Sequence, residues 1–244
     1  MELTHLSASG IHLFNQCPSA FFAKYRDKIV TDETNDTYAK YGTLFHEIAE
    51  NIANKEYENI EEPLKHFKKN FRSCGLTEKQ NPADYYKQGI NAIETAWVEL
   101  NAMNVVGAEV NFKINRLEDA PPLVGFIDLV YRDEKNRLVV RDYKTSKKYT
   151  KSQMAKQWQP YFYSIACKEI YGEYPYKFEF QFVRFGEVGS VLIDDVFIKR
   201  HDVMLCGIVN QIKKEIEKAN WNPFYCENFC ASKSLCAKYL SKHS

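Results

Sequence analysis

The sequence contains little glycine and little proline. Its 244 residues include 10 Gly and 8 Pro, a usage below the average that excludes a collagen-like chain and a Pro/Gly-rich disordered one. No apolar run approaches the roughly 18 residues that a membrane-spanning helix needs, so we expect no membrane partner. The first residues provide neither a basic segment nor an apolar one, which predicts that no signal peptide is present.

An excess of charge of one sign is also missing. The chain has 33 Lys and Arg against 32 Asp and Glu, a formal net charge of +1, so any anionic partner must be met by a local patch. Residues 144–156 form such a patch, although a run of this kind is by itself more typical of a solvated helix start. The patch has no acidic residue, and its lysines are Lys144, Lys147, Lys148, Lys151 and Lys156.

Apolar residues are ample, at 45% hydrophobic and 14% aromatic, which is enough for a sizeable core. Periodicity predicts helices at 7–25, 39–54, 61–73, 83–103, 151–171, 201–219 and near 232–241, and strands at 105–116, 123–131, 137–143, 176–184 and 190–198. This order predicts an α/β fold with a mixed sheet, rather than a regular βαβ repeat.

The strands expected at 123–131 and 137–143 form a hairpin that brings acidic residues together. A turn centred near residue 135 places Asp128 beside Asp142 on the neighbouring strand, and Lys144 shares the face of Asp142. Adjacent carboxylates at the end of apolar strands are unfavourable unless a cation neutralises them, and a hard divalent ion is the natural choice. The alternative is a surface hairpin whose Asp and Lys form a salt bridge.

Other residues have two interpretations each. His46 lies at the edge of an apolar helical stripe. It is either a metal ligand or a packed residue. Gln157 and Tyr161 are one turn apart on the helix expected at 151–171 and so share a face. They either contact a phosphate or a base, or are an ordinary helix pair. Glu109, in the strand before the hairpin, is a further ligand or a salt-bridge partner.

The seven cysteines are an odd number in a chain without a secretion signal, which argues against a disulfide framework. The spacing Cys226-x3-Cys230-x5-Cys236 clusters three soft ligands, whereas a 4Fe–4S cluster or an all-cysteine zinc site needs four thiolates. Spacing alone does not choose the fourth ligand among Cys17, Cys74, Cys167 and Cys206.

Together these residues resemble the RecB-like branch of the PD-(D/E)xK nuclease superfamily. The likeness covers nearly the whole chain and is greatest to the iron–sulfur members: CRISPR-associated adaptation exonucleases, AddB-type nuclease domains and phage exonucleases. The matching segments are the helix from Leu6 to Pro18 with its cysteine, Gly42–Glu47 (G-x-x-x-H-E), Gly125–Asp128 (G-x-x-D), Asp142–Lys144 ((D/E)-x-K), Gln157–Tyr161 (Q-x3-Y) and the cysteine tail. The tail has one residue more than the usual C-x2-C-x5-C.

The resemblance implies a restriction-endonuclease-like core in a single nuclease domain over 1–244. Residues 1–104 would be its helical part, 105–199 the sheet core with the catalytic motifs, and 200–244 the C-terminal helix and cysteine cluster. Asp128, Asp142 and Lys144 would be catalytic. The ligands of Mg2+ or Mn2+ would be His46, Asp128, Asp142 and the backbone carbonyl of Tyr143, with Glu109 as an auxiliary.

The resemblance also assigns the remaining sites. Cys17, Cys226, Cys230 and Cys236 would hold a structural 4Fe–4S cluster that staples the two ends of the chain, with Zn2+ as the alternative. Gln157, Tyr161, Lys147, Lys148 and Lys151 would contact the nucleic acid.

The implied activity is that of a divalent-metal-dependent DNA exonuclease. It would hydrolyse phosphodiester bonds of single strands or free ends in the cytoplasm of a bacterial, archaeal or phage-infected cell, with recombination or CRISPR-type proteins as partners. The alternatives are a catalytically silent DNA-binding module and a zinc-stapled repair endonuclease.

Overall fold

Six strands form one mixed sheet in the computed structural model, which describes residues 3–29, 36–118, 120–214 and 217–243. The strands are β1 (Leu6–Ser7), β2 (Asn104–Ile114), β3 (Leu123–Arg132), β4 (Leu138–Lys144), β5 (Lys177–Phe182) and β6 (Glu187–Leu192). The helices are α1 (Ala8–Gln16), α2 (Pro18–Tyr25), α3 (Thr37–Ala53), α4 (Glu61–Asn70), α5 (Pro82–Ala102), α6 (Lys151–Met154), α7 (Gln159–Tyr171), α8 (Asp195–Lys213), α9 (Pro223–Asn228) and α10 (Ala237–His243), with short 3-10 turns at η1 (Phe71–Cys74), η2 (Glu78–Gln80) and η3 (Lys233–Leu235).

Strand β3 is the centre of the site-bearing part of the sheet. One of its edges pairs antiparallel with β2 from end to end. Its other edge is shared, because β1 pairs in parallel with Leu123 and Val124 whereas β4 pairs antiparallel from Leu129 onwards. The segment Gly125–Asp128 therefore lies between these two partners. Beyond β4 the order continues with β5 in parallel and β6 antiparallel, which confirms the mixed sheet.

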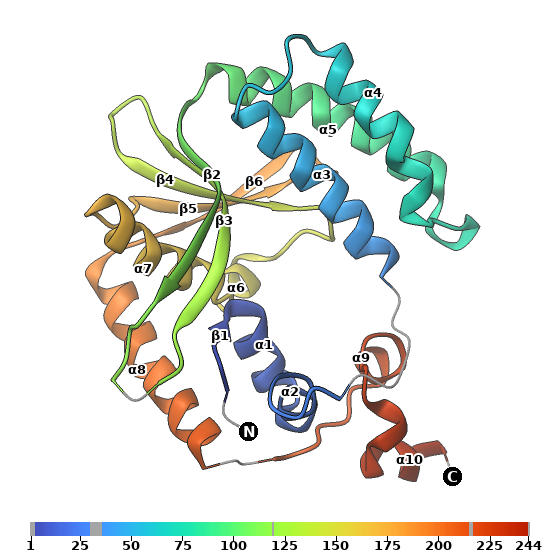
Figure 1. Ribbon diagram of the computed structural model, residues 1–244, viewed down its shortest axis with the longest axis vertical. Coiled ribbons are helices and arrows are strands. Elements are labelled where there is room, and N and C mark those ends of the chain that lie inside the picture. Colours follow the sequence, from blue (N-terminus) through green and yellow to red (C-terminus); the bar gives the residue numbers. More distant parts are fainter. Residues whose placement is uncertain (1–2, 30–35, 119, 215–216, 244) are drawn as a thin grey trace.

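Helices cover both faces of the sheet (Figure 1). Helices α3, α4 and α5 pack on one face, where Val139 and Tyr143 of β4 are buried. Helices α1, α2, α7 and α8 contribute to the core on the other face, where Leu138 and Val140 are buried. Alternate residues of β4 thus enter opposite cores, which explains why this strand is almost continuously apolar.

Two of the predicted helices are broken by local backbone chemistry. The helix predicted at 7–25 divides into α1 and α2 at Cys17, which is extended (φ −156°, ψ 99°), because a residue before proline is driven out of the helical region. Ser7 caps α1, since its Oγ accepts from the Gly10 N–H at 3.0 Å. The helix predicted at 151–171 divides into α6 and α7, with Pro160 in the first turn of α7, where proline is tolerated.

The strand predicted at 190–198 is also shorter than expected. It ends at Leu192, and the Asp194 side chain accepts from the Phe197 N–H at 2.7 Å, which caps α8. The helix predicted at 201–219 therefore begins at Asp195, before its predicted start.

In the described part of the chain, no helix combines the length and the apolar character that crossing a membrane requires.

Candidate active site

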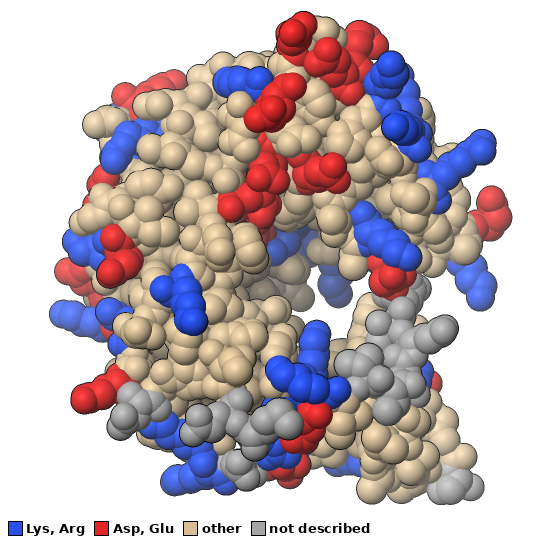
Figure 2. Space-filling model, in the orientation of Figure 1, with Lys and Arg blue, Asp and Glu red and all other residues tan. Residues whose placement is uncertain are grey.

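A cleft of about 1490 Å³ runs between the helix α3 and the helices α1 and α8, with the sheet at its base. Figure 2 shows the molecule hollowed between these parts, with basic side chains visible inside the hollow. Strands β2 and β3 contribute Glu109, Asn111 and Asp128 to the lining, and the segment after β4 contributes residues 144–159. Most of the residues singled out in the sequence therefore line this one cleft, although some of them are 100 or more positions apart.

The hairpin has the predicted register. Four consecutive pairs, from Leu129 with Arg141 to Arg132 with Leu138, are centred on the turn near residue 135. The two strands part beyond these pairs, and the backbone N–H of Tyr143 donates to the Asp128 carboxylate at 2.7 Å. The carboxylate thereby occupies the gap that opens between β3 and β4.

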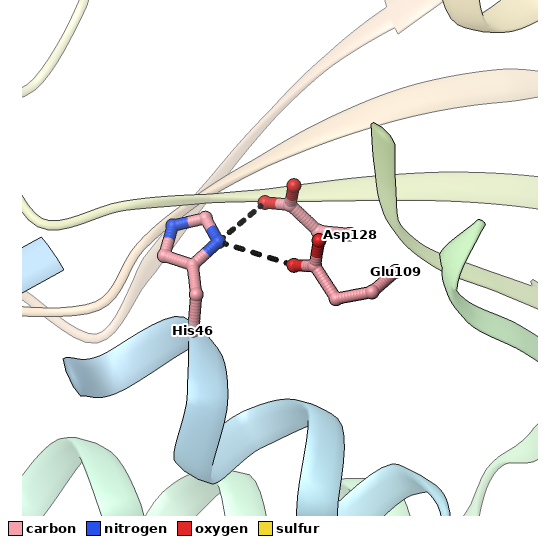
Figure 3. Close-up of side chains that lie close together, drawn as sticks. All are labelled: His46, Glu109 and Asp128. Carbon is pink, nitrogen blue, oxygen red and sulfur yellow. Dashed lines mark ion pairs between the residues drawn. The ribbon is translucent and has the colours of Figure 1, made fainter. Parts of the chain in front are cut away.

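Three side chains from α3, β2 and β3 converge into a group that could hold a metal ion: His46, Glu109 and Asp128. His46 Nδ1 lies 3.3 Å from Asp128 Oδ2 and 3.6 Å from Glu109 Oε1. Figure 3 shows the imidazole rising from α3 towards both carboxylates. Asp128 is buried, and the other two side chains are about three-quarters buried.

Glu109 reaches this group through a special backbone geometry. Its neighbours in β2 pair with the neighbours of Asp128 in β3, so the two acidic residues lie opposite each other. Its φ of +45° is in the left-handed region, which costs a non-glycine residue of the order of 1 kcal/mol or more and is concentrated at functional sites. The strand also has a register irregularity between Val105 and Gly107. Irregularities of this kind re-aim side chains next to active sites.

The imidazole of His46 is oriented by the backbone. Its Nε2 lies 3.0 Å from the carbonyl oxygen of Tyr143, and because a carbonyl only accepts, Nε2 carries the proton. In the neutral ring Nδ1 is then the atom with the free lone pair, and it faces the two carboxylates. A hydrogen bond to the far nitrogen is the usual way in which proteins fix a ligating histidine. The Tyr143 carbonyl, expected as a metal ligand, contacts His46 in this way.

The electrostatics of the group favour a bound cation. Burial alone lowers the pKa of His46, but the charges of Asp128, Glu109 and Asp142 outweigh it and raise this pKa to about 9. Burial and the neighbouring charge of Asp142 raise the pKa of Asp128 to about 7. The site therefore holds more negative charge than its own residues neutralise, and a divalent ion would relieve this excess.

Asp142 and Lys144 form a second part of the site together with Gln159, at the start of α7. Lys144 Nζ lies 2.6 Å from Asp142 Oδ2 and donates to Gln159 Oε1 at 2.8 Å. Gln159 Nε2 donates in turn to Asp142 Oδ1 at 2.6 Å. Among the described residues Asp142 Oδ2 accepts no well-aligned hydrogen bond, although it is buried. The amide of Gln159 thus holds both the carboxylate and the ammonium group in place.

The structure separates Gln157 from Tyr161. Gln157 lies in the turn before α7, where its Nε2 donates to the Gln153 carbonyl at 3.2 Å, and it lines the cleft. Tyr161 is completely buried, and its hydroxyl donates to Asp202 of α8. The expected shared helical face does not exist, because the helix begins only at Gln159.

A second Gln-x3-Tyr pair, two residues further on, occupies the site instead. Gln159 Nε2 lies 3.4 Å from the Tyr163 hydroxyl, and both residues line the cleft. Helical periodicity alone did not point to this pair. The signal was Pro160, which belongs in the first turn of a helix and so indicates a start near residue 159.

The predicted lysines are also divided. Lys147 lines the cleft, as do Lys156 and Arg200 of α8, the latter not singled out in the sequence. Lys148 is exposed and pairs with Glu187 at 2.7 Å. Lys151 is an exposed residue at the start of α6. One basic side of the cleft therefore comes from the segment after β4 and from α8 together.

All four predicted cluster cysteines line a separate cavity of about 190 Å³, between α2 and the C-terminal segment. Cys17 meets the tail cysteines there because Pro18 holds it in an extended conformation between α1 and α2. The backbone N–H of Asn220 lies 3.5 Å from the Cys17 sulfur. The other three cysteines lie outside this cavity: Cys74 and Cys167 are buried elsewhere and Cys206 is exposed on α8.

Comparisons with known proteins identify the family of the chain. No curated protein matches the sequence significantly. The structure of a candidate exonuclease from Eubacterium rectale is similar, with a TM-score of 0.53 and 14% identity, over 98% of this chain and 88% of that one. The structure of SSO0001 is matched with a TM-score of 0.45 and 12% identity, over the same shares of the two chains. The family model of the PD-(D/E)XK nuclease superfamily matches residues 5–237, and the chain therefore belongs to this superfamily.

Proposed function

We propose that this protein is a divalent-metal-dependent exonuclease that hydrolyses phosphodiester bonds at the ends of single-stranded DNA. The observation that supports it best is the convergence, in one cleft, of the group His46, Glu109 and Asp128 with the linked pair Asp142 and Lys144. PD-(D/E)XK nucleases use divalent metals, and the membership of this chain in their superfamily agrees with that chemistry.

The residues of the site fit Mg2+ or Mn2+. Carboxylate oxygens suit these hard ions, and Asp128 and Asp142 provide buried carboxylates with an excess of negative charge. His46 and Glu109 would complete the ligand set from the facing helix and strand. When bound, the cation supplies positive charge to the phosphate and lowers the pKa of a water molecule.

Lys144 contributes the fixed positive charge of the site. Burial disfavours its charged form, but Asp142 outweighs burial, so the pKa of Lys144 is raised and the side chain stays an ammonium. Held by Asp142 and Gln159, this ammonium would orient the attacking water and stabilise the negative charge that develops on the phosphate. Lys147, Lys156 and Arg200 would contact neighbouring phosphates along the cleft.

We further infer that Cys17, Cys226, Cys230 and Cys236 hold a structural 4Fe–4S cluster. Their four thiols line one cavity of about 190 Å³, which brings together the number of cysteine ligands that such a cluster needs. Thiolates are the ligands of such clusters. Hydrolysis needs no electron transfer, so the cluster would act only by joining α2 to the C-terminal segment.

Incubation of end-labelled single-stranded DNA with Mn2+ tests the activity. We expect progressive shortening from one end, and comparison of 5′-labelled with 3′-labelled strands gives the direction of cleavage. Circular single-stranded DNA is the control, because an exonuclease leaves it intact. Cleavage of the circle would instead indicate an endonuclease, and binding without cleavage would indicate a DNA-binding module.

Substitution of His46 by alanine tests the ligand set. We expect His46→Ala to raise the Mn2+ concentration for half-maximal cleavage at least about 10-fold, because a buried nitrogen ligand is lost. His12→Ala is the matched control, since His12 also lines the cleft but lies outside the group of possible ligands. A metal titration identical to that of the wild type would mean that His46 only packs against Tyr143.

The two glutamines before and in α7 provide a matched pair. Gln159→Ala is expected to lower the cleavage rate by roughly 10- to 100-fold, since positioning partners of this kind have effects of that size. Gln157→Ala should leave the rate unchanged, because its side-chain amide donates to the Gln153 carbonyl, whereas that of Gln159 donates to Asp142. Cleavage assays at saturating Mn2+ measure both. The reverse order of effects would show that Gln157 is the residue that acts on the substrate.

A further inference from the structure

Phe126 is an anomaly in the middle of the sheet. Strand β3 is central and buries most of its residues, with Ile127 and Leu129 both 0% exposed. Phe126 is 55% exposed, and among the described residues no other aromatic ring packs against it. It is part of the lining of the cleft. A large apolar ring exposed in a cleft that also carries charged side chains indicates a ligand with an apolar face.

The position of Phe126 places its ring beside the reactive group. It precedes Asp128 by two residues in β3, and both residues line the cleft. Their Cα atoms are then separated by about 7 Å, which is comparable to one extended nucleotide. Neither β1 nor β4 pairs with this part of β3, because their pairing ends at Val124 and begins at Leu129. This edge of the strand therefore stays open towards the cleft.

The rest of the cleft defines the kind of ligand. Lys144, Lys147, Lys156 and Arg200 provide positive charge along the lining, which suits a chain of phosphates. A ligand that combines regularly spaced anionic groups with flat apolar faces is a nucleic acid strand with unpaired bases. Tyr161, the aromatic expected to serve such a strand, is buried and paired with Asp202, so it has no free face.

We propose that Phe126 is the stacking platform for the nucleobase next to the scissile phosphate. This proposal rests on the nuclease function proposed above and adds the residue that binds a base of its unpaired strand. A base within a duplex has both faces covered by its neighbours, whereas an unstacked base offers one face to the ring. Because every base has such a face, the contact would tolerate any sequence.

Fluorescence anisotropy with two labelled strands of about 12 nucleotides tests this proposal in EDTA, where no cleavage occurs. One strand is oligothymidylate, and the other has the same backbone with abasic residues throughout. We expect Phe126→Ala to weaken binding of oligothymidylate roughly 10-fold and to leave binding of the abasic strand unchanged. Phe126→Trp should bind oligothymidylate at least as well as the wild type, whereas Phe126→Leu should resemble the alanine variant.

Tyr176→Ala is the matched control, because Tyr176 is 40% exposed but lies outside the cleft lining, and it should bind both strands like the wild type. Equal weakening of both strands by Phe126→Ala, no weakening of either, or wild-type binding by Phe126→Leu would overturn the stacking role. Base-dependent binding without cleavage in Mg2+ or Mn2+ would overturn the nuclease function and leave the stacking role standing. A wild type that binds neither strand would overturn both.

Discussion

Asp128→Asn is expected to abolish metal-dependent DNA cleavage, with a loss of at least about 1000-fold, while the protein stays folded. The substitution removes the negative charge at the centre of the group with His46 and Glu109. It keeps the size of the side chain, and the amide oxygen still accepts from the N–H of Tyr143. Cleavage of end-labelled single-stranded DNA and thermal unfolding in EDTA measure the two effects separately.

Glu179→Gln is the matched control, because it also replaces a buried carboxylate of the same sheet. Glu179 is 4% exposed and pairs with Arg141 at 2.9 Å and with Lys177 at 2.6 Å. Breaking a buried ion pair lowers the free energy of unfolding by on the order of 3 kcal/mol. The control should therefore lose stability and keep cleavage, the opposite of Asp128→Asn. Wild-type cleavage by a folded Asp128→Asn protein would refute the assigned site.

The effect of Glu179→Gln on stability is expected to depend on pH. Burial opposes ionisation of Glu179, but Arg141 and Lys177 outweigh burial and hold the pKa of this carboxyl below its ordinary value. Its contribution to stability is therefore present at neutral pH and is lost as the pH falls through the lowered pKa. The stability difference between wild type and Glu179→Gln should accordingly shrink on acidification.

Cys17→Ala is expected to lower iron content and thermal stability together. Anaerobically purified wild type should be brown and contain about four irons per chain. Loss of the link between α2 and the C-terminal segment resembles loss of a cross-link that closes a loop of more than 100 residues. Such a loss lowers the free energy of unfolding by on the order of 4 kcal/mol. For a chain of this size this corresponds to a decrease of roughly 10 °C in Tm. Iron analysis and calorimetry provide the measurements.

Substitution of two other cysteines distinguishes the loss of a metal ligand from the loss of packing. Cys167→Ala should keep its iron but lose some stability, because Cys167 is fully buried in the main core. Cys206→Ala should change neither quantity, because Cys206 is exposed. Stoichiometric zinc in place of iron would contradict the cluster but not the four-thiol site. Loss of metal from Cys167→Ala, and none from Cys17→Ala, would show that Cys17 is not the fourth ligand.

The parts of the site that could be predicted are those that depend on local pairing. The hairpin with Asp128 and Asp142 is joined by a short turn, where the N–H groups of Lys135 and Arg137 donate to the Asp133 carboxylate. A turn of this length leaves little choice of register. The parting of the strands beyond Leu129 could not be predicted, since β1, from the far N-terminal end of the chain, takes the next part of the edge of β3 that β4 leaves.

The residues whose positions differ from those predicted lie where the backbone departs from periodicity. A continuous helix over 151–171 would place Gln157 and Tyr161 on one face, but the chain begins a new helix at Gln159. Tyr161 is then turned into the core, and Gln159 takes the position beside Asp142. Periodicity shows that a segment is helical more reliably than it shows where the helix begins.

The sequence by itself determined the mixed α/β fold, the hairpin register and the clustered thiols of the tail, because these follow from periodicity and short spacing. Only the tertiary structure decided that Glu109 joins His46 and Asp128, that Cys17 faces the tail cysteines, and that Phe126 stays exposed in the cleft. These contacts join distant parts of the chain, so they depend on how helices pack on both faces of the sheet. Local residue preferences do not specify that packing.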